Sequence, residues 1–194
     1  MPARYVMTTA ATLLLAVSPL SPMHAQAGTT PPNDSVSADA AFIRRAAADN
    51  LLEVQLGELA QHQATNSMVQ KFGERMVIDH GRLEKQWTDL ASKYGVPLKA
   101  TLGSKNQQKV DRLRQAKGAT FDREYMIAMI KGHEKDAEEL KAEVDSARSE
   151  PVRKMAAYAL PIVREHLLLA RAAAKEVGVD SATVARSRRV AESK

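Results

Sequence analysis

Residues 67–94 read SMVQKFGERMVIDHGRLEKQWTDLASKY. Apolar side chains recur in this stretch at intervals of three, four or seven residues, which is typical of one face of an α-helix. They are Val69, Phe72, Met76, Leu83, Trp87 and Leu90. Asn66 and Ser67 make a tight break before the stretch, and Gly95 followed by Pro97 ends it. The pattern predicts an amphipathic helix of about 28 residues.

Three other stretches have the same pattern, at residues 37–65, 120–148 and 149–177. Short turns join the first helix to the second and the third to the fourth, so each pair is expected to form an antiparallel hairpin. The long connection at 95–118 contains a short polar helix, 104–117, and can cross the bundle from end to end. The predicted fold is therefore all-α, a ferritin-like four-helix bundle. A plain up-down bundle with a lid on one end is the alternative.

The N-terminus of the sequence predicts an exported protein. Residues 1–27 have the features of a secretory signal peptide, with an apolar run and an Ala25-Gln26-Ala27 cleavage site. The run is shorter than the about 20 residues that a membrane span needs, so we expect no transmembrane span in the mature chain. We expect a disordered linker at 28–36, the bundle domain at 37–177 and a flexible basic tail at 178–194. The predicted location is the periplasm, with attachment at the periphery of the outer membrane left open.

The amino-acid composition excludes several kinds of functional site. The 194 residues include no cysteine, which excludes thiol catalysis, disulfides, thiolate zinc sites and iron–sulfur clusters. A net charge of +5, from 28 basic and 23 acidic side chains, is a mixed surface and not a basic block. We therefore expect no nucleic-acid partner. Two partners are left open: a second copy of the chain in a homodimer, or another envelope protein.

Three histidines and one glutamate are expected to form a polar layer at the middle of the bundle. His80, His133 and His166 each lie within the apolar stripe of their helix. In a pair of antiparallel helices, the residue numbers of two facing positions add up to the same value along the whole pair. This rule places His133 beside His166 and His80 opposite Glu53. Imidazole and carboxylate groups that converge in a buried layer are suitable ligands for Fe, Mn, Zn or Cu.

Other side chains near this layer are candidates for smaller roles. Met76 and Met129 lie four residues before His80 and His133, so their thioethers are possible additional ligands that would favour copper. Asp79, Glu134 and Glu165 flank the histidines but project about 100° away from them around the helix. We expect these carboxylates to support the ligands or to lie at the surface.

The alternative is a polar layer without metal, which fixes the helix register in a non-enzymatic envelope protein that binds another protein. The residues three before each histidine are apolar, so most carboxylates of a ferritin-type di-iron centre are missing. We found no catalytic motif for nucleotide or acyl-transfer chemistry. The sequence therefore favours a binding role over an enzymatic one.

Several runs resemble a bacterial family, the domain of unknown function 4142, which is often labelled "predicted outer membrane protein". The resemblance covers about residues 38–175. The matching runs are 53–60 (EVQLGELA), 72–80 (FGERMVIDH), 121–126 (FDREYM), 133–135 (HEK), Leu160-Pro161 and Glu165-His166. The resemblance implies an exported, ferritin-like helical bundle and implies no particular activity.

Overall fold

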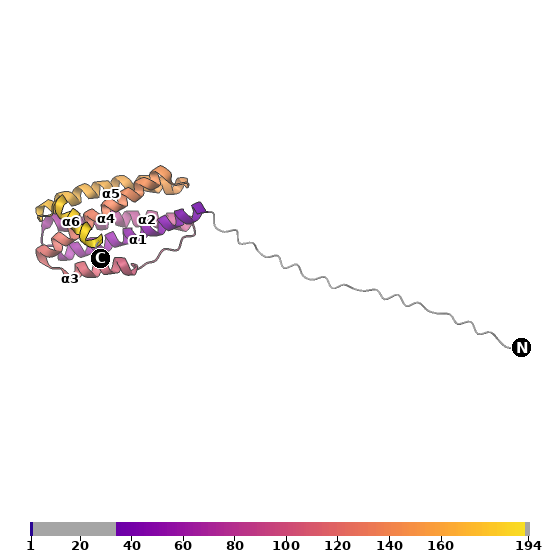
Figure 1. The fold of residues 1–194 in the computed structure, drawn as a ribbon, viewed down its shortest axis with the longest axis horizontal. Coiled ribbons are helices and arrows are strands. Elements are labelled where there is room, and N and C mark those ends of the chain that lie inside the picture. Colours follow the sequence, from indigo (N-terminus) through magenta and orange to yellow (C-terminus); the bar gives the residue numbers. More distant parts are fainter. Residues whose placement is uncertain (2–33, 193–194) are drawn as a thin grey trace. The chain divides into compact units, whose positions relative to one another are not determined.

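The structure is a computed structural model that describes Met1 and residues 34–192, with side chains described from residue 38 to residue 186. Residues 34–192 contain six helices and no strand. The helices are α1 (Asp34–Gln63), α2 (Ser67–Lys93), α3 (Ser104–Gln115), α4 (Gly118–Ser146), α5 (Glu150–Glu176) and α6 (Ser181–Glu192). The four long helices form a bundle, as predicted, with α3 lying alongside it (Figure 1).

The first hairpin, α1 and α2, is closed by a polar turn. Asn66 caps α2 by accepting hydrogen bonds from the amides of Met68 and Val69. Asp122, from α4, accepts hydrogen bonds from the amides of Thr65 and Asn66 at 3.0 and 2.9 Å. The buried Asp122 carboxylate therefore joins this turn to the second hairpin.

The second hairpin, α4 and α5, is antiparallel as predicted. Ser149 caps α5 by accepting a hydrogen bond from the amide of Val152. The hydroxyl of Tyr94, at the end of α2, contacts the hydroxyl of Ser149. Gly95 and Gly178, just beyond the ends of α2 and α5, have positive φ angles of 59° and 68°, a backbone conformation that glycine adopts without steric cost.

The crossover returns the chain to the far end of the bundle, so that α2 and α4 run in the same direction (Figure 1). Its helix α3 packs against α1 and α4. Val110 and Leu113 are the buried residues of α3, which otherwise faces solvent. The predicted arrangement of two hairpins joined by one crossover is thus confirmed.

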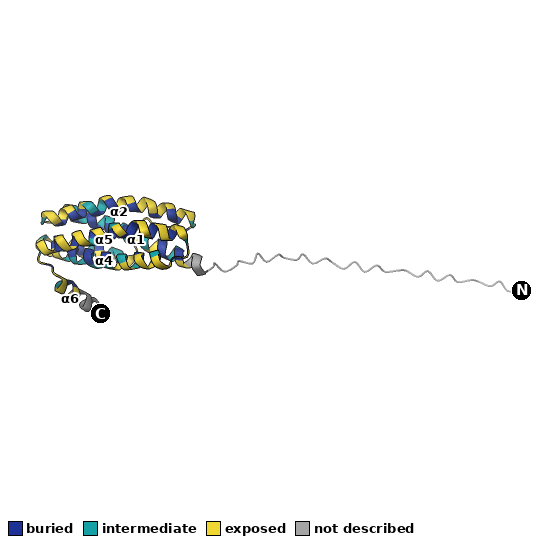
Figure 2. Cartoon of the chain, turned by 90° about the horizontal axis from the view of Figure 1, so that it is seen from above, coloured by how far each residue is buried: buried dark blue, intermediate teal, exposed yellow. Residues whose placement is uncertain are grey.

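The long helices turn their buried residues toward one another and their exposed residues outward (Figure 2). The buried apolar residues form two clusters, one around Phe72 and Tyr125 and the other around Phe42 and Trp87. The two helices of the first hairpin approach so closely that a Cβ on Gly73 would lie 2.8 Å from the Cβ of Ala60. Only glycine permits this distance between the helix backbones.

The structure has helix beyond both predicted bounds of the bundle domain, 37–177. The helix α1 begins at Asp34, within the segment that we expected to be a disordered linker. The expected flexible tail, 178–194, contains helix α6, because Asp180 accepts a hydrogen bond from the Thr183 amide at 2.7 Å and begins the helix. Val179 and Val184 are buried in the core and hold this segment against the bundle.

The signal-peptide prediction for 1–27 and the linker prediction for 28–33 lie outside the described residues. Among the described helices, none combines the length and the apolar character that crossing a membrane requires.

Candidate metal centre

Three imidazole rings meet at the middle of the bundle. His80, His133 and His166 project from α2, α4 and α5, and their exposed fractions are 3%, 0% and 0%. The ring centroids are 5.7 Å apart for His80 and His133, 5.1 Å for His80 and His166, and 5.4 Å for His133 and His166. One ligand nitrogen from each ring lies within 4.8 Å of the other two. The predicted convergence of the three histidines is therefore present in the structure.

A side chain of α1 sets the tautomer of His80. The Nδ2 atom of Asn50 donates a hydrogen bond to the carbonyl oxygen of His80 at 2.9 Å. The Oδ1 atom of Asn50 is then the acceptor that lies 3.0 Å from Nδ1 of His80. Nδ1 of His80 must carry the proton, because an amide oxygen only accepts hydrogen bonds. The lone pair of this ring is left on Nε2.

Acceptors set the tautomers of the other two rings in the same way. Nδ1 of His133 donates to the carbonyl oxygen of Met129 at 2.9 Å. Nε2 of His166 donates to Oδ2 of Asp79 at 3.0 Å. Since a carbonyl and an ionised carboxylate can only accept, the lone pairs lie on Nε2 of His133 and Nδ1 of His166.

The remaining nitrogen of each ring has no hydrogen-bond partner among the described residues. These buried atoms are Nε2 of His80, Nε2 of His133 and Nδ1 of His166. A buried nitrogen without a partner is costly, because folding removes its hydrogen bonds to water and supplies none in return. Rings that are held through one nitrogen and present a free lone pair on the other are the usual arrangement of metal-binding histidines.

The three rings favour the neutral form that binds metals. Burial, with the charges of His133 and His166 adding to it, lowers the pKa of His80 well below its ordinary value. Burial and the nearby His166 lower the pKa of His133 to about 4. Burial also lowers the pKa of His166, although the hydrogen bond to Asp79 opposes that effect.

The flanking carboxylates take different positions. Asp79 is buried, contacts His166 and is held by ion pairs with Arg75 and, at 3.5 Å, with Arg82. Burial raises the pKa of Asp79, but the hydrogen bonds from Arg75 and His166 outweigh it and lower the pKa overall. Glu165 is exposed and lies 3.3 Å from Nη2 of Arg75. Asp79 is therefore the flanking carboxylate that supports a ring directly.

Glu134 instead lies near the surface. Its Oε1 atom accepts a hydrogen bond from Arg171 of α5 at 2.9 Å. This ion pair joins the two helices of the second hairpin.

Glu53 does not join the three rings. The group of close ligand atoms consists of the three histidines, and Asn50 occupies the position opposite His80 where we expected Glu53. The carboxylate of Glu53 instead lies against α4, where a Cβ on Gly132 would be 3.0 Å from Oε1. Burial raises the pKa of Glu53 well above its ordinary value, with the charges of Asp136 and Asp49 adding to that effect.

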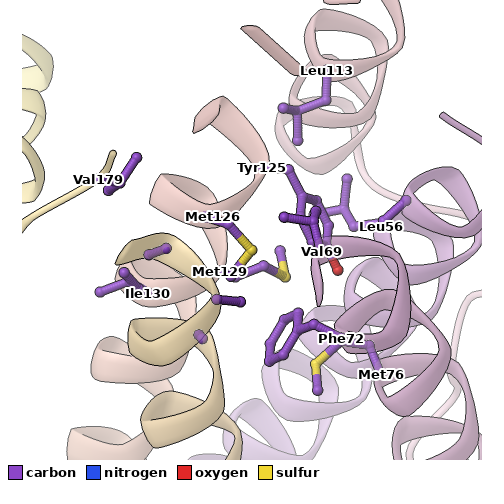
Figure 3. Packing of buried hydrophobic residues seen from close by; sticks show 14 of the residues in the cluster. Leu56, Val69, Phe72, Met76, Leu113, Tyr125, Met126, Met129, Ile130 and Val179 are labelled. Carbon is purple, nitrogen blue, oxygen red and sulfur yellow. The ribbon is translucent and has the colours of Figure 1, made fainter. Parts of the chain in front are cut away.

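Met76 and Met129 are completely buried in the cluster around Phe72, which Figure 3 shows. The Phe72 ring lies edge-on to His133, with a centroid distance of 6.3 Å. Both methionines thus belong to the apolar packing on one side of the histidines. Their role as ligands stays a prediction.

Asn50 is the residue near the rings that sequence reasoning missed. It lies four residues after Ala46 and two before Leu52, within the apolar stripe of α1. A polar side chain at a position that the helical period buries needs a hydrogen-bond partner. That requirement is the signal that could have placed it beside His80.

Comparison with known proteins gives a family and a fold. The family model named "Domain of unknown function (DUF4142)" matches residues 21–173. No curated protein matches the chain. Among solved structures, a DUF305 protein from Streptomyces coelicolor is 13% identical, with a TM-score of 0.63 over 75% of this chain and 96% of that one.

A DUF305 fragment from Deinococcus radiodurans is also similar. It is 12% identical, with a TM-score of 0.61 over 72% of this chain and 95% of that one. At these identities the likeness concerns the fold. It supports the all-helical architecture described above.

Proposed function

The chain belongs to the family Domain of unknown function (DUF4142), and we propose that it binds one transition-metal ion through His80, His133 and His166. The observation that carries the proposal is the set of three buried ring nitrogens that converge and have no hydrogen-bond partner in the part of the chain that the structure describes. Each opposite nitrogen donates to an acceptor, so no ring needs to lose a proton when the metal binds.

The donor set favours Zn²⁺ or Cu²⁺. Imidazole suits zinc, copper and iron, whereas manganese prefers carboxylate ligands. Among the described residues, the group of close ligand atoms contains no carboxylate. Metal–nitrogen distances of about 2.0–2.1 Å require the nitrogens to lie no more than about 4 Å apart. The three ligand nitrogens lie within 4.8 Å of one another, so small rotations of the rings bring the nitrogens into that range. Three protein ligands leave a further coordination position for water or an outside ligand.

The unpaired nitrogens also argue against the alternative of a purely structural polar layer. A layer that only fixed helix register would be expected to pair its buried polar atoms with one another. Here Asn50, Asp79 and the Met129 carbonyl satisfy one nitrogen of each ring, and the other three are left unpaired. Metal coordination would satisfy all three at once.

The biological role that we propose is metal handling or stress protection in the cell envelope. It rests on the signal-peptide features of residues 1–27, which predict export and cleavage after Ala27. Fractionation of cells, with mass spectrometry of the purified chain, tests this point. We expect a periplasmic protein whose first residue is Gly28. A cytoplasmic chain with an intact N-terminus would contradict export.

Metal binding is tested on protein purified without chelators and then titrated with Zn²⁺, Cu²⁺ and Mn²⁺ separately. We expect one Zn²⁺ or Cu²⁺ per chain and much weaker binding of Mn²⁺. The variants His80→Ala, His133→Ala and His166→Ala should each lose that stoichiometric binding. The matched control is His62→Ala, because His62 is an exposed histidine of α1. Equal binding by the wild type and the three variants would overturn the proposal.

A further inference from the structure

The three rings of the histidine centre form a ligand set without charge. Each ring donates a hydrogen bond through one nitrogen and is neutral, with its lone pair on the other nitrogen. The nitrogens that carry the lone pairs are buried, and one ligand nitrogen of each ring lies within 4.8 Å of the other two. An ion bound by these rings would keep its whole charge, because neutral imidazole compensates none of it.

The charged groups on the α2 and α5 side of the rings cancel one another. Asp79 contacts His166 at 3.0 Å and pairs with Arg75 and, at 3.5 Å, with Arg82. Arg75 also pairs with Glu165, at 3.3 Å. Two carboxylates and two guanidinium groups bring no net charge to this network. It therefore holds the His166 ring in place but leaves a bound cation largely uncompensated.

The buried carboxyl group on the α1 and α4 side adds no negative charge either. Glu53 is 3% exposed, and its Oε1 atom lies against Gly132, the residue before His133. Burial, with the charges of Asp136 and Asp49 adding to it, raises the pKa of Glu53 well above its ordinary value. The carboxyl group is therefore protonated and neutral at pH 7.

A buried, neutral site discriminates between ions by their charge. The free energy needed to remove an ion from water rises with the square of its charge. The attraction of the ion to three neutral ligands rises only in proportion to the charge. Since the rings are 0–3% exposed, little water remains to solvate a bound ion. A singly charged ion is therefore favoured over a doubly charged one.

The number of ligands favours the same ion. Imidazole binds copper, and Cu²⁺ prefers a tetragonal set of nitrogen and oxygen ligands, whereas Cu⁺ is stable with three ligands. Around the rings, Phe72 packs edge-on against His133 with a centroid distance of 6.3 Å. Water ligands that complete the coordination of Cu²⁺ would have to be buried together with the ion. The three rings alone are sufficient for Cu⁺.

We propose that the histidine centre binds Cu⁺ in preference to Cu²⁺, with the three rings as the complete ligand set of the ion. The inference rests on the proposed function and deepens it, because it names the oxidation state of the metal that the site selects.

Two competition titrations of the metal-free full chain measure the preference. Cu⁺ is supplied without oxygen in the presence of ascorbate and competes with bicinchoninate, whereas Cu²⁺ is supplied in air and competes with nitrilotriacetate. We expect the dissociation constant of Cu⁺ to be about a hundredfold lower than that of Cu²⁺. For a one-electron couple, this raises the reduction potential of the bound copper by about 120 mV relative to the free ions. Voltammetry measures that potential independently.

The variant Asp79→Asn tests the charge argument, since it removes the carboxylate that contacts His166. The electrostatic attraction of a carboxylate to an ion is proportional to the charge of the ion. If Cu²⁺ binding weakens about ten- to a hundredfold, Cu⁺ binding should weaken only about three- to tenfold. The preference for Cu⁺ should therefore increase. The matched control is Glu165→Gln, which removes an exposed carboxylate that pairs with Arg75 and should leave the preference unchanged.

The site of Cu⁺ binding is tested with two histidine variants. His133→Ala should lose stoichiometric binding of Cu⁺, whereas His62→Ala, which changes an exposed histidine of α1, should retain it. Equal Cu⁺ affinity in His133→Ala and the wild type would overturn the inference, because the ion would then be held elsewhere.

Three other results would overturn the inference. Binding of Cu²⁺ or Zn²⁺ at the rings, with Cu⁺ bound no more tightly than Cu²⁺, would overturn it and leave the proposed function standing. A preference for Cu⁺ that does not increase in Asp79→Asn would overturn it too. Absence of any metal binding by the wild type would overturn the proposed function, and the inference with it. If Asp79→Asn does not fold, as judged by circular dichroism, the two titrations of the wild type still decide.

Discussion

Asn50 and His80 exchange two hydrogen bonds across the first hairpin, amide nitrogen to backbone carbonyl at 2.9 Å and ring Nδ1 to amide oxygen at 3.0 Å. One short side chain thereby fixes the position of the α2 backbone, the plane of a ring and the location of its lone pair. Asp79 also has two partners, because it accepts a hydrogen bond from His166 and forms an ion pair with Arg75.

Asp79→Asn should weaken Zn²⁺ or Cu²⁺ binding about ten- to a hundredfold, because a neutral amide orients and polarises the His166 ring less well than a carboxylate. Competition with a chromophoric chelator measures the change. Glu165→Gln is the control, since it also removes a carboxylate that pairs with Arg75, whereas the hydrogen bond of the His166 ring is with Asp79. Equal losses of metal affinity in both variants would show that the surface charge, and not the contact with the His166 ring, determines the affinity.

Metal binding should raise the melting temperature of the wild type and leave that of His133→Phe unchanged. A free metal concentration of one hundred times the dissociation constant adds about 2.7 kcal/mol to the free energy of unfolding. For a domain of this size, this corresponds to an increase of about 5–10 °C. Melting curves with and without EDTA measure it, and His62→Ala should retain the full increase. A metal-dependent shift in His133→Phe equal to that of the wild type would contradict this prediction.

The metal-free protein should lose stability as the pH falls from 6.5 to 4. The pKa of His133 is about 4 in the folded chain and near 6.5 when unfolded, so the unfolded state binds more protons in that range. His133 alone should lower the free energy of unfolding by about 3 kcal/mol at pH 4 relative to pH 7. The lowered pKa values of His80 and His166 act in the same direction.

This contribution is isolated by comparison with a variant, because Asp136, whose pKa is raised to about 6, acts in the opposite direction. Urea denaturation of the wild type and of His133→Phe at several pH values measures the difference. The variant should show a shallower dependence over this range. Parallel curves for the two proteins would be inconsistent with a buried, neutral His133.

Gly73→Ala should destabilise the bundle by about 1–3 kcal/mol, because the added methyl would lie 2.8 Å from Ala60 and 2.9 Å from the carbonyl oxygen of Gly57. Gly81→Ala lies on the same helix with no atom within 4 Å of the new Cβ. It should stabilise by about 0.5–1 kcal/mol, through helix propensity alone. Chemical denaturation of both variants measures the two effects. Equal effects of the two substitutions would argue against a close contact between α1 and α2.

The four long helices and both hairpins could be predicted because their signals are local. The apolar period of 67–94 and the Ser149-Glu150-Pro151 start signal predicted α2 and α5 to within a residue or two. The convergence of His133 and His166 also followed, since the short turn between their helices fixes which positions face each other. These features depend on periodicity and turn length alone.

The partner of His80 could not be predicted in the same way. The turn between α1 and α2 located the facing region but not the rotation of α1 about its axis, and Glu53 and Asn50 lie less than one turn apart. The packing of α1 against α2 places Asn50 beside His80, where its amide donates to the backbone carbonyl and accepts from the ring at the same time. Helix α6 was missed for a related reason, because Val179 and Val184 are stabilised by contacts with the distant core and not by a local pattern.

The division of the core into two apolar clusters has a consequence for how this protein can change over evolutionary time. The clusters around Phe72 and around Phe42 are separate, so we expect the stability effects of substitutions in different clusters to add where the residues lie more than about 7–10 Å apart. Each half can therefore accumulate mutations independently of the other. The three histidines between them have no such freedom, because each ring shares its surroundings with the other two, and a change in one alters the selection on all three.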